Sequence, residues 1–313
     1  MKTLFRRFGA PALAALFSLA SIAPAQSTAP VQPQPAPQQT APATDDAPAR
    51  PALWKVADAD TTIYLFGTIH ALPKDIDWLN GKVVEAFDGS EELVTEILEP
   101  TPEAMQNLVM TRALLPKGQT LRGMLSAPQR KSLEAALGTL NMPLTTFDMF
   151  EPWYAAIGLA TLPLMREGFT SENGVESVLD ARAKASGRPH SALETMEFQI
   201  NLFDSLPVAA QKTYLTSVAT QLPSLKDQLG QMISAWKRGD ADGLAKLMNA
   251  DEDDPALIKA LLIDRNRTWA DWIKQRLDKP GAVFIAVGAG HLAGPGSVQD
   301  QLKTLGLTSE RVQ

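Results

Sequence analysis

Two of the three histidines in this 313-residue chain end the same short pattern, Gly-x-x-His, directly after an apolar run. The runs are Ile63-Tyr-Leu-Phe-Gly67-Thr-Ile-His70 and Val283-Phe-Ile-Ala-Val-Gly288-Ala-Gly-His291. Short apolar runs bounded by glycine are typical of buried β-strands. Open α/β sheets hold their ligands beyond the carboxyl ends of their strands. Because the two runs lie near opposite ends of the chain, they predict a fold that joins its first and last strands, and one site with two imidazoles.

The amino terminus has the features of a secretory signal peptide, which we predict over residues 1–25. Lys2, Arg6 and Arg7 form a basic region, Ala10–Ile22 is a short apolar core, and Ala23-Pro-Ala25 is a small-x-small cleavage signal. The apolar core is shorter than the roughly 20 residues of a good membrane span. We therefore expect no stable membrane span in the mature chain.

Composition separates a linker from a folded domain. Residues 26–51 are rich in Pro, Ala, Gln and Thr, and such a segment buries too little apolar surface to order itself. We predict a disordered linker there and one domain over 52–313. The signal peptide predicts a periplasmic or secreted location. The chain has no cysteine, so disulfides are excluded, and export without disulfides fits a bacterial periplasm better than a small secreted scaffold. With a net charge of −6 and no basic stripe, the chain is not expected to bind nucleic acid.

The hydrophobic pattern predicts an α/β (α+β) fold. The first part predicts a hairpin from Leu53–Val56 and Thr61–Phe66, then a helix over Leu79–Phe87 and a strand over Glu92–Leu98 lying parallel to the hairpin's second strand. Helices dominate the middle, and the main ones are predicted over Pro152–Met165, Gly174–Ala185, Val208–Trp236 and Pro255–Leu277. A short strand, Pro189–Glu194, interrupts them, and strands at Ala282–Val287 and Arg311-Val312 close the chain. We expect a mostly parallel or mixed central sheet formed by the terminal strands.

Two glutamates are candidates to join the histidines. Glu96 interrupts an otherwise apolar run, and a buried, ionised carboxylate is expensive unless it is paired or binds a metal. Alternatively, Glu96 has a structural role and forms an ion pair with an Arg or Lys. Glu194 ends the short strand and could serve the same site, or could be a helix-start carboxylate favoured by the macrodipole. His190 lacks the glycine pattern, and we interpret it as structural.

Arg267 is the candidate cation. It could neutralise Glu96 or Glu194, or stabilise an oxyanion, and a surface role is the alternative. The sequence has no thiol nucleophile, no His-Glu-x-x-His helix, no Gly-x-Ser-x-Gly elbow and no phosphate-binding glycine loop. The residues alone leave a shared metal site and an acid–base site both open, since neutral imidazole is a common ligand of divalent ions.

These motifs resemble those of the TraB/PrgY/GumN family. The matching segments, which extend over almost all of the chain after the linker, are Trp54-Lys-Val, Thr62–Pro73, Glu96, Gly174-Val-Glu176, Leu193-Glu-Thr195, Gln199, Arg265-Asn-Arg267 and Val287–Leu292. The family is related to the Tiki metalloproteases. The resemblance implies metal-dependent hydrolysis, with His70, Glu96 and His291 binding a divalent ion such as Zn, Mn or Co and with Glu194 and Arg267 nearby.

We therefore expect a periplasmic, metal-dependent hydrolase, in particular a peptidase that acts on a peptide or another small secreted substrate. The catalytic residues would be Glu96, His70, His291, Glu194 and Arg267. The alternative is a non-catalytic periplasmic protein that binds and sequesters a peptide or glycan.

Overall fold

The computed structural model describes residues 48–249 and 255–313, and its fold is built on one six-stranded mixed sheet in the order β4-β3-β5-β2-β1-β6. The strands are β1 (Leu53–Ala57), β2 (Thr61–Thr68), β3 (Glu92–Thr95), β4 (His190–Ala192), β5 (Gly281–Gly288) and β6 (Glu310–Arg311). β4, β3, β5 and β2 run parallel, whereas β1 runs antiparallel to β2 and β6. The predicted α/β class and the joining of the terminal strands are confirmed.

One predicted strand pairing is wrong. The sequence predicted that β2 and β3 are parallel neighbours, but β5 lies between them and is parallel to both. Its register pairs Gly288 with Thr68 of β2 and Ala286 with Thr95 of β3. With a strand on each side and a layer on each face, β5 is apolar along its whole length, as central parallel strands are. The carboxyl ends of β2, β3 and β5 still meet at one edge.

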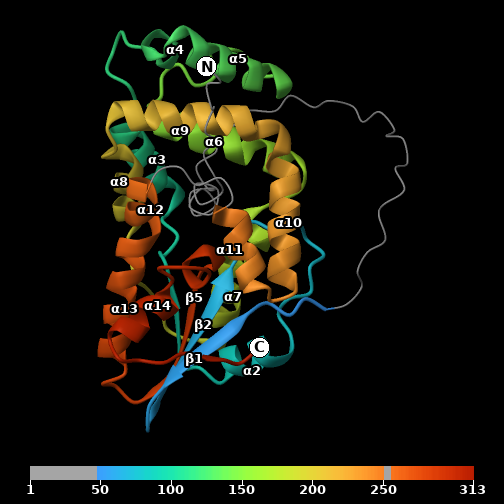
Figure 1. Cartoon of the computed structure of the whole chain (residues 1–313), viewed down its shortest axis with the longest axis vertical. Helices are drawn as coiled ribbons and strands as arrows, with labels where there is room; N and C mark the ends of the chain where they lie inside the picture. Colours follow the sequence, from blue (N-terminus) through green and yellow to red (C-terminus); the bar gives the residue numbers. More distant parts are fainter. Residues whose placement is uncertain (1–47, 250–254) are drawn as a thin grey trace, which may run out of the picture.

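Helices cover both faces of the sheet (Figure 1). On one face α13 (Asp264–Arg276) and α14 (Val298–Thr304) place Trp269, Ile273 and Leu302 in a core with the β5 residues Val283 and Ile285. On the other face α2 (Gly81–Asp88) and α7 (Val175–Ser186) border the larger core, in which Phe87 meets Phe284 edge-on at 5.3 Å. The central strands are therefore buried on both faces.

The remaining helices extend beyond the carboxyl ends of the parallel strands (Figure 1). They are α3 (Pro102–Arg112), α4 (Leu121–Met124), α5 (Ala127–Thr139), α6 (Pro152–Arg166), η2 (Ser171–Asn173), α8 (Met196–Asp204), α9 (Val208–Gln221), η3 (Leu222–Ser224), α10 (Leu225–Lys237), α11 (Ala241–Asn249), α12 (Pro255–Ile258), η4 (Lys259–Ile263) and η5 (Ala289–Leu292). The helix predicted over Val208–Trp236 is divided at η3, which contains Pro223, because proline cannot donate the helical hydrogen bond. η4 is a π-helix directly before α13.

The folded domain begins slightly before the predicted boundary at residue 52. Ala49 is buried, its amide donates to Asp77 O, and the Arg50 amide donates to Lys237 O. The predicted signal peptide, 1–25, and nearly all of the predicted linker, 26–51, lie outside the described residues. Within the described part of the chain, no helix is long and apolar enough to cross a membrane.

Candidate functional site

His70 lies just beyond β2, and Glu176 of α7 holds its ring. Nδ1 of His70 is 2.6 Å from Oε1 of Glu176, which also accepts a hydrogen bond from the Thr68 hydroxyl. Gly174 permits this docking, because a Cβ there would lie 2.1 Å from the backbone oxygen of His70. Burial by itself would lower the pKa of His70, but the nearby carboxylates of Glu176 and Glu96 outweigh it and leave that pKa raised.

Glu96, the first residue after β3, is fully enclosed and satisfied. Its Oε1 accepts a 2.7 Å hydrogen bond from the Gly288 amide, and its Oε2 accepts from Arg265 at 2.7 Å and from Gln199 at 3.0 Å. Burial alone would raise the pKa of this carboxyl, but the Arg265 charge, together with the hydrogen bond from the Gly288 amide, holds it well below its usual range. Glu96 is therefore ionised throughout the physiological pH range.

His291 sits in η5 with both ring nitrogens engaged. Nδ1 is 2.5 Å from Asn266 Oδ1, and Nε2 is 3.0 Å from Nη1 of Arg265. The Asn266 amide nitrogen donates to Gly296 O, which fixes the amide so that its oxygen faces the ring. Nδ1 is thus the protonated nitrogen and Nε2 the acceptor. Burial, then the adjacent Arg265 charge, lowers the pKa of His291 to about 3, so the ring is neutral.

Arg265 of α13 joins the two glutamates. Its guanidinium donates to Glu96 and to both carboxylate oxygens of Glu194, with the shortest contacts at 2.7 and 2.8 Å. Glu194 follows β4 and lies beside Glu96 because its amide donates to Glu96 O at 2.8 Å. Gln199 and the Trp269 indole complete the shell of Glu194, each at 3.0 Å. The result is one continuous buried network.

The sequence prediction chose the wrong arginine as partner of these carboxylates. Arg267 is 60% exposed along its side chain and its partner is Asp264 at 3.4 Å, whereas Arg265 pairs with Glu96 and Glu194. Helical geometry explains the difference, because residues four apart share a face and residues two apart do not. Arg265 is four residues before the buried Trp269, and that spacing could have identified it.

Four of the five predicted residues come together, at a position marked by Gly288. A Cβ on Gly288 would lie 3.0 Å from Glu96 Oε1 and 3.1 Å from His70 Nε2, so both atoms lie against this glycine. His291 Nε2 is 3.8 Å from Glu96 Oε1, and Glu194 adjoins Glu96. The sequence prediction missed Glu176, Arg265, Asn266 and Gln199 as members of the site, and the family-like motifs in which they lie were the available signal.

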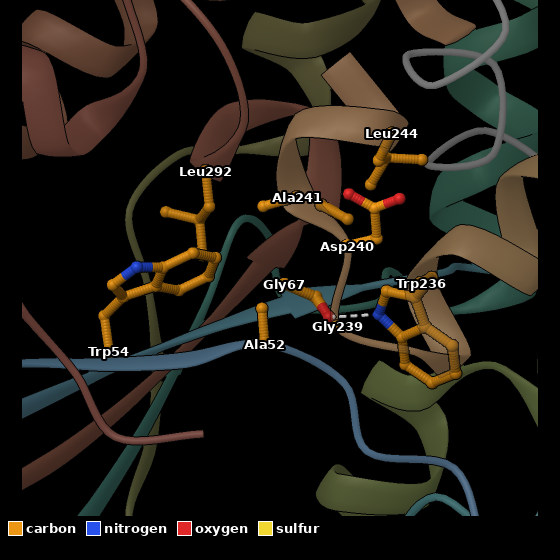
Figure 2. A pocket seen from close by; sticks show the side chains of 10 residues that line it. Ala52, Trp54, Gly67, Trp236, Gly239, Asp240, Ala241, Leu244 and Leu292 are labelled. Carbon is orange, nitrogen blue, oxygen red and sulfur yellow. Dashed lines mark hydrogen bonds between the residues drawn. The ribbon is translucent and has the colours of Figure 1, made fainter. Parts of the chain in front are cut away.

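The open side of the site is apolar. A small pocket beside His70 is lined by Leu229 and Met232 of α10, Leu244 and Met248 of α11, and the turn Gly288-Ala-Gly290. Leu244 and Ala289 also line a neighbouring pocket over the β1–β2 hairpin. The side chains of Trp54, from β1, and Trp236, from α10, line the same pocket (Figure 2). There the Trp236 indole donates to Gly67 O at 2.7 Å and so ties α10 to the end of β2. Of the two histidines, only His70 lines the pocket beside the site.

The donor set implied for a metal, His70, Glu96 and His291, does not fit a metal ion in this arrangement. His291 offers no unused lone pair, since Nδ1 bonds Asn266 and Nε2 accepts from Arg265. The Arg265 charge already lies against the Glu96 carboxylate. Among the described residues, no group of three or more His, Asp or Glu side chains is arranged to hold a metal ion.

The fold and site define an α/β protein with a histidine–glutamate centre at the carboxyl edge of a parallel sheet. The chain belongs to the TraB/PrgY/gumN family, whose model matches residues 52–311. It is 26% identical over 258 residues to the uncharacterised protein YbaP of Escherichia coli (strain K12), covering 81% of this chain and 92% of that protein. It is 22% identical over 267 residues to an uncharacterised protein of Treponema pallidum (strain Nichols), covering 80% and 79%. No solved structure matches the chain significantly.

Proposed function

We propose that this protein is a periplasmic hydrolase that cleaves a peptide bond in a secreted substrate, with His70 as the base that activates water. The observation that carries the proposal is the His70–Glu176 pair: an imidazole held by a carboxylate at 2.6 Å, beside a pocket, at the carboxyl edge of the sheet. A base oriented by a third group is the arrangement that nucleophile activation requires. The peptide substrate and the periplasmic location rest on the family resemblance and the predicted signal peptide.

In this reaction Nε2 of His70 takes a proton from water, and the hydroxide adds to the carbonyl carbon. The imidazolium then returns the proton to the amine as the carbon–nitrogen bond breaks. Glu176 and Glu96 both favour the imidazolium, because their negative charges lie close to the ring. The buried network of Glu96, Arg265 and Glu194 holds this edge rigid, so that the base keeps its orientation.

The test compares hydrolysis of a mixed peptide library by the wild-type protein, His70→Gln and the matched control His190→Gln. His190 also pairs with a carboxylate, Asp180 at 2.8 Å, but it lies in β4 away from the pocket. We expect at least a 100-fold loss of turnover in His70→Gln, of the size that general bases contribute, and near wild-type turnover in the control. Full turnover by His70→Gln would refute the proposal.

The same experiment separates the hydrolase from the alternative, a protein that binds a peptide or glycan without cleaving it. A binder would capture one ligand per chain with no product. Adding a chelator to the assay tests the predicted metal separately. Inactivation by chelator, reversed by Zn, Mn or Co, would show that the hydrolase needs an ion.

A further inference from the structure

We propose that Arg265 is the resident cation of this site, taking the place of a divalent metal between Glu96, Glu194 and His291, and that removing it converts these three residues into a metal site. The guanidinium lies 2.7 Å from Glu96, 2.8 Å from Glu194 and 3.0 Å from His291 Nε2. Two carboxylates and one imidazole are a set of ligands that divalent ions such as zinc accept. In this chain they surround an arginine.

Burial shows why a cation is needed at this position. The side chains of Arg265, Glu96, Glu194 and His291 are each 6% exposed or less. Two carboxylates so far from water must be compensated by a positive charge. Arginine suits this task because its planar fork stays charged and donates along several directions at once. A further hydrogen bond, from Nη1 to Leu261 O at 3.0 Å, anchors the guanidinium to η4.

The same geometry excludes a second cation from these ligands. A divalent ion bonded to Glu96 Oε2 or His291 Nε2 would touch the guanidinium, and like charges repel strongly in a buried, weakly screened site. Its bond to His291 would also replace the hydrogen bond that Nε2 accepts from Arg265. The wild-type protein is therefore expected to hold no ion at these three residues. This departs from the metal that the family resemblance implies.

Removal of the guanidinium reverses each of these conditions. Arg265→Ala leaves the Glu96 and Glu194 carboxylates uncompensated and releases the Nε2 lone pair of His291. Asn266 still orients the ring through Nδ1, as the partner of a metal-binding histidine does. A divalent ion entering this space would restore the charge balance.

The experiment measures Co²⁺ binding to the chelator-treated protein by visible absorption and calorimetry, in five forms: wild type, Arg265→Ala, His291→Ala, Arg265→Ala/His291→Ala, and the control Arg122→Ala. Arg122 also pairs with a carboxylate, Asp148 at 2.7 Å, but at the distant α4. We expect one Co²⁺ per chain in Arg265→Ala, bound at least 100-fold more tightly than by wild type or the control. The double variant should lose this site.

Thermal unfolding supplies a second measurement in case Arg265→Ala is poorly folded. Co²⁺, or millimolar guanidinium chloride, should raise the melting temperature of Arg265→Ala and leave that of the control unchanged. One ion per wild-type chain, lost in His291→Ala, would overturn the proposal. So would an Arg265→Ala protein that neither Co²⁺ nor guanidinium stabilises. None of these readouts depends on hydrolysis, so the proposal can fail or stand independently of the proposed function.

Discussion

The amide of Gly288 donates a 2.7 Å hydrogen bond to Oε1 of Glu96, which locks the end of β5 to the first residue after β3. Glycine is required at position 288 because a side chain there would clash with its neighbours. A Cβ would lie 3.0 Å from Glu96 Oε1 and 3.1 Å from His70 Nε2, so any side chain would crowd both the carboxylate and the imidazole. Gly288 thus permits both groups to pack against the end of β5.

Gly288→Ala is therefore expected to reduce turnover more than it reduces stability. The added methyl group would displace His70, which is partly exposed, more easily than the buried Glu96. We expect at least a tenfold loss of turnover, since misplacement of a catalytic group by about 1 Å can cost 100-fold. The control is Gly230→Ala in α10, where a Cβ would meet nothing within 4 Å. It should gain about 0.4–1 kcal/mol of stability. Equal turnover in both variants would contradict this reading.

Replacing Glu96 by alanine should destabilise the fold strongly. Loss of one partner of a buried ion pair costs about 3–5 kcal/mol, and Arg265 would keep only Glu194 as a partner carboxylate. Because the folded-state pKa of Glu96 is depressed, its contribution is present above the ordinary carboxyl pKa of about 4.3 and is lost as the pH falls through the folded-state value. Urea unfolding of wild type and Glu96→Ala at pH 7 and pH 3 should show the difference between them shrinking at the lower pH.

Glu176→Gln should shift the pH profile of the reaction. The proposed reaction needs neutral His70, whose pKa is raised in the wild type, so kcat/KM should rise with pH through a value above about 6.5. The amide removes the negative charge that favours the imidazolium. The rising limb should therefore move to lower pH while the maximal rate falls. An unchanged midpoint would show that His70 is not the titrating base.

The raised pKa of His70 also makes a stability prediction with a definite sign. The pairing of protonated His70 with Glu176 stabilises the folded state. This stabilisation is fully present below the unfolded-state pKa of His70 and is lost as the pH rises through its folded-state pKa. Glu176→Gln should therefore be destabilised relative to wild type at pH 5.5 and less so at pH 9. Thermal unfolding at the two pH values measures this directly.

The two histidines should respond differently to alanine. His70→Ala should lose turnover, and at pH 9, where the stabilisation from its pair with Glu176 is lost, it should change the melting temperature little. His291→Ala leaves Asn266 and Arg265 short of a partner and removes a ring contact with Trp269 at 4.3 Å. We expect it to lose about 1–3 kcal/mol of stability. A fully stable His291→Ala protein would contradict the structural role of this ring.

Truncation at the amino terminus should lower the melting temperature only when it removes residues 48–51. A chain beginning at residue 48 should keep the full melting temperature. One beginning at residue 52 loses the backbone hydrogen bonds of Ala49 and Arg50 and the contact of Gln313 with Pro51 O. We expect its melting temperature to fall by several degrees, since each lost hydrogen bond costs about 1 kcal/mol. Equal melting temperatures would show that these residues do not belong to the folded unit.

The sequence by itself determined the strands and the positions of three site residues along them. His70, Glu96 and His291 could be assigned to strand ends because apolar runs with bounding glycines depend on neighbouring residues alone. Parallel strands then bring their carboxyl ends to one edge, so the convergence followed even though the predicted neighbour of β2 was wrong. Which strand lies beside which depends on contacts between distant parts of the chain, and these leave no local pattern.

Only the tertiary structure decided the partners of these residues. Glu176 reaches His70 because α7 docks on the end of β2, and Arg265 reaches Glu96 because α13 packs across the sheet. The sequence predicted a buried Glu96 that needed compensation, and it left open whether an ion pair or a metal supplied it. The choice between an ion pair and a metal depends on where α13 packs, because its Arg265 is 169 residues from Glu96 along the chain. Packing and burial settle that position, because they alone determine which charge meets the carboxylate away from water.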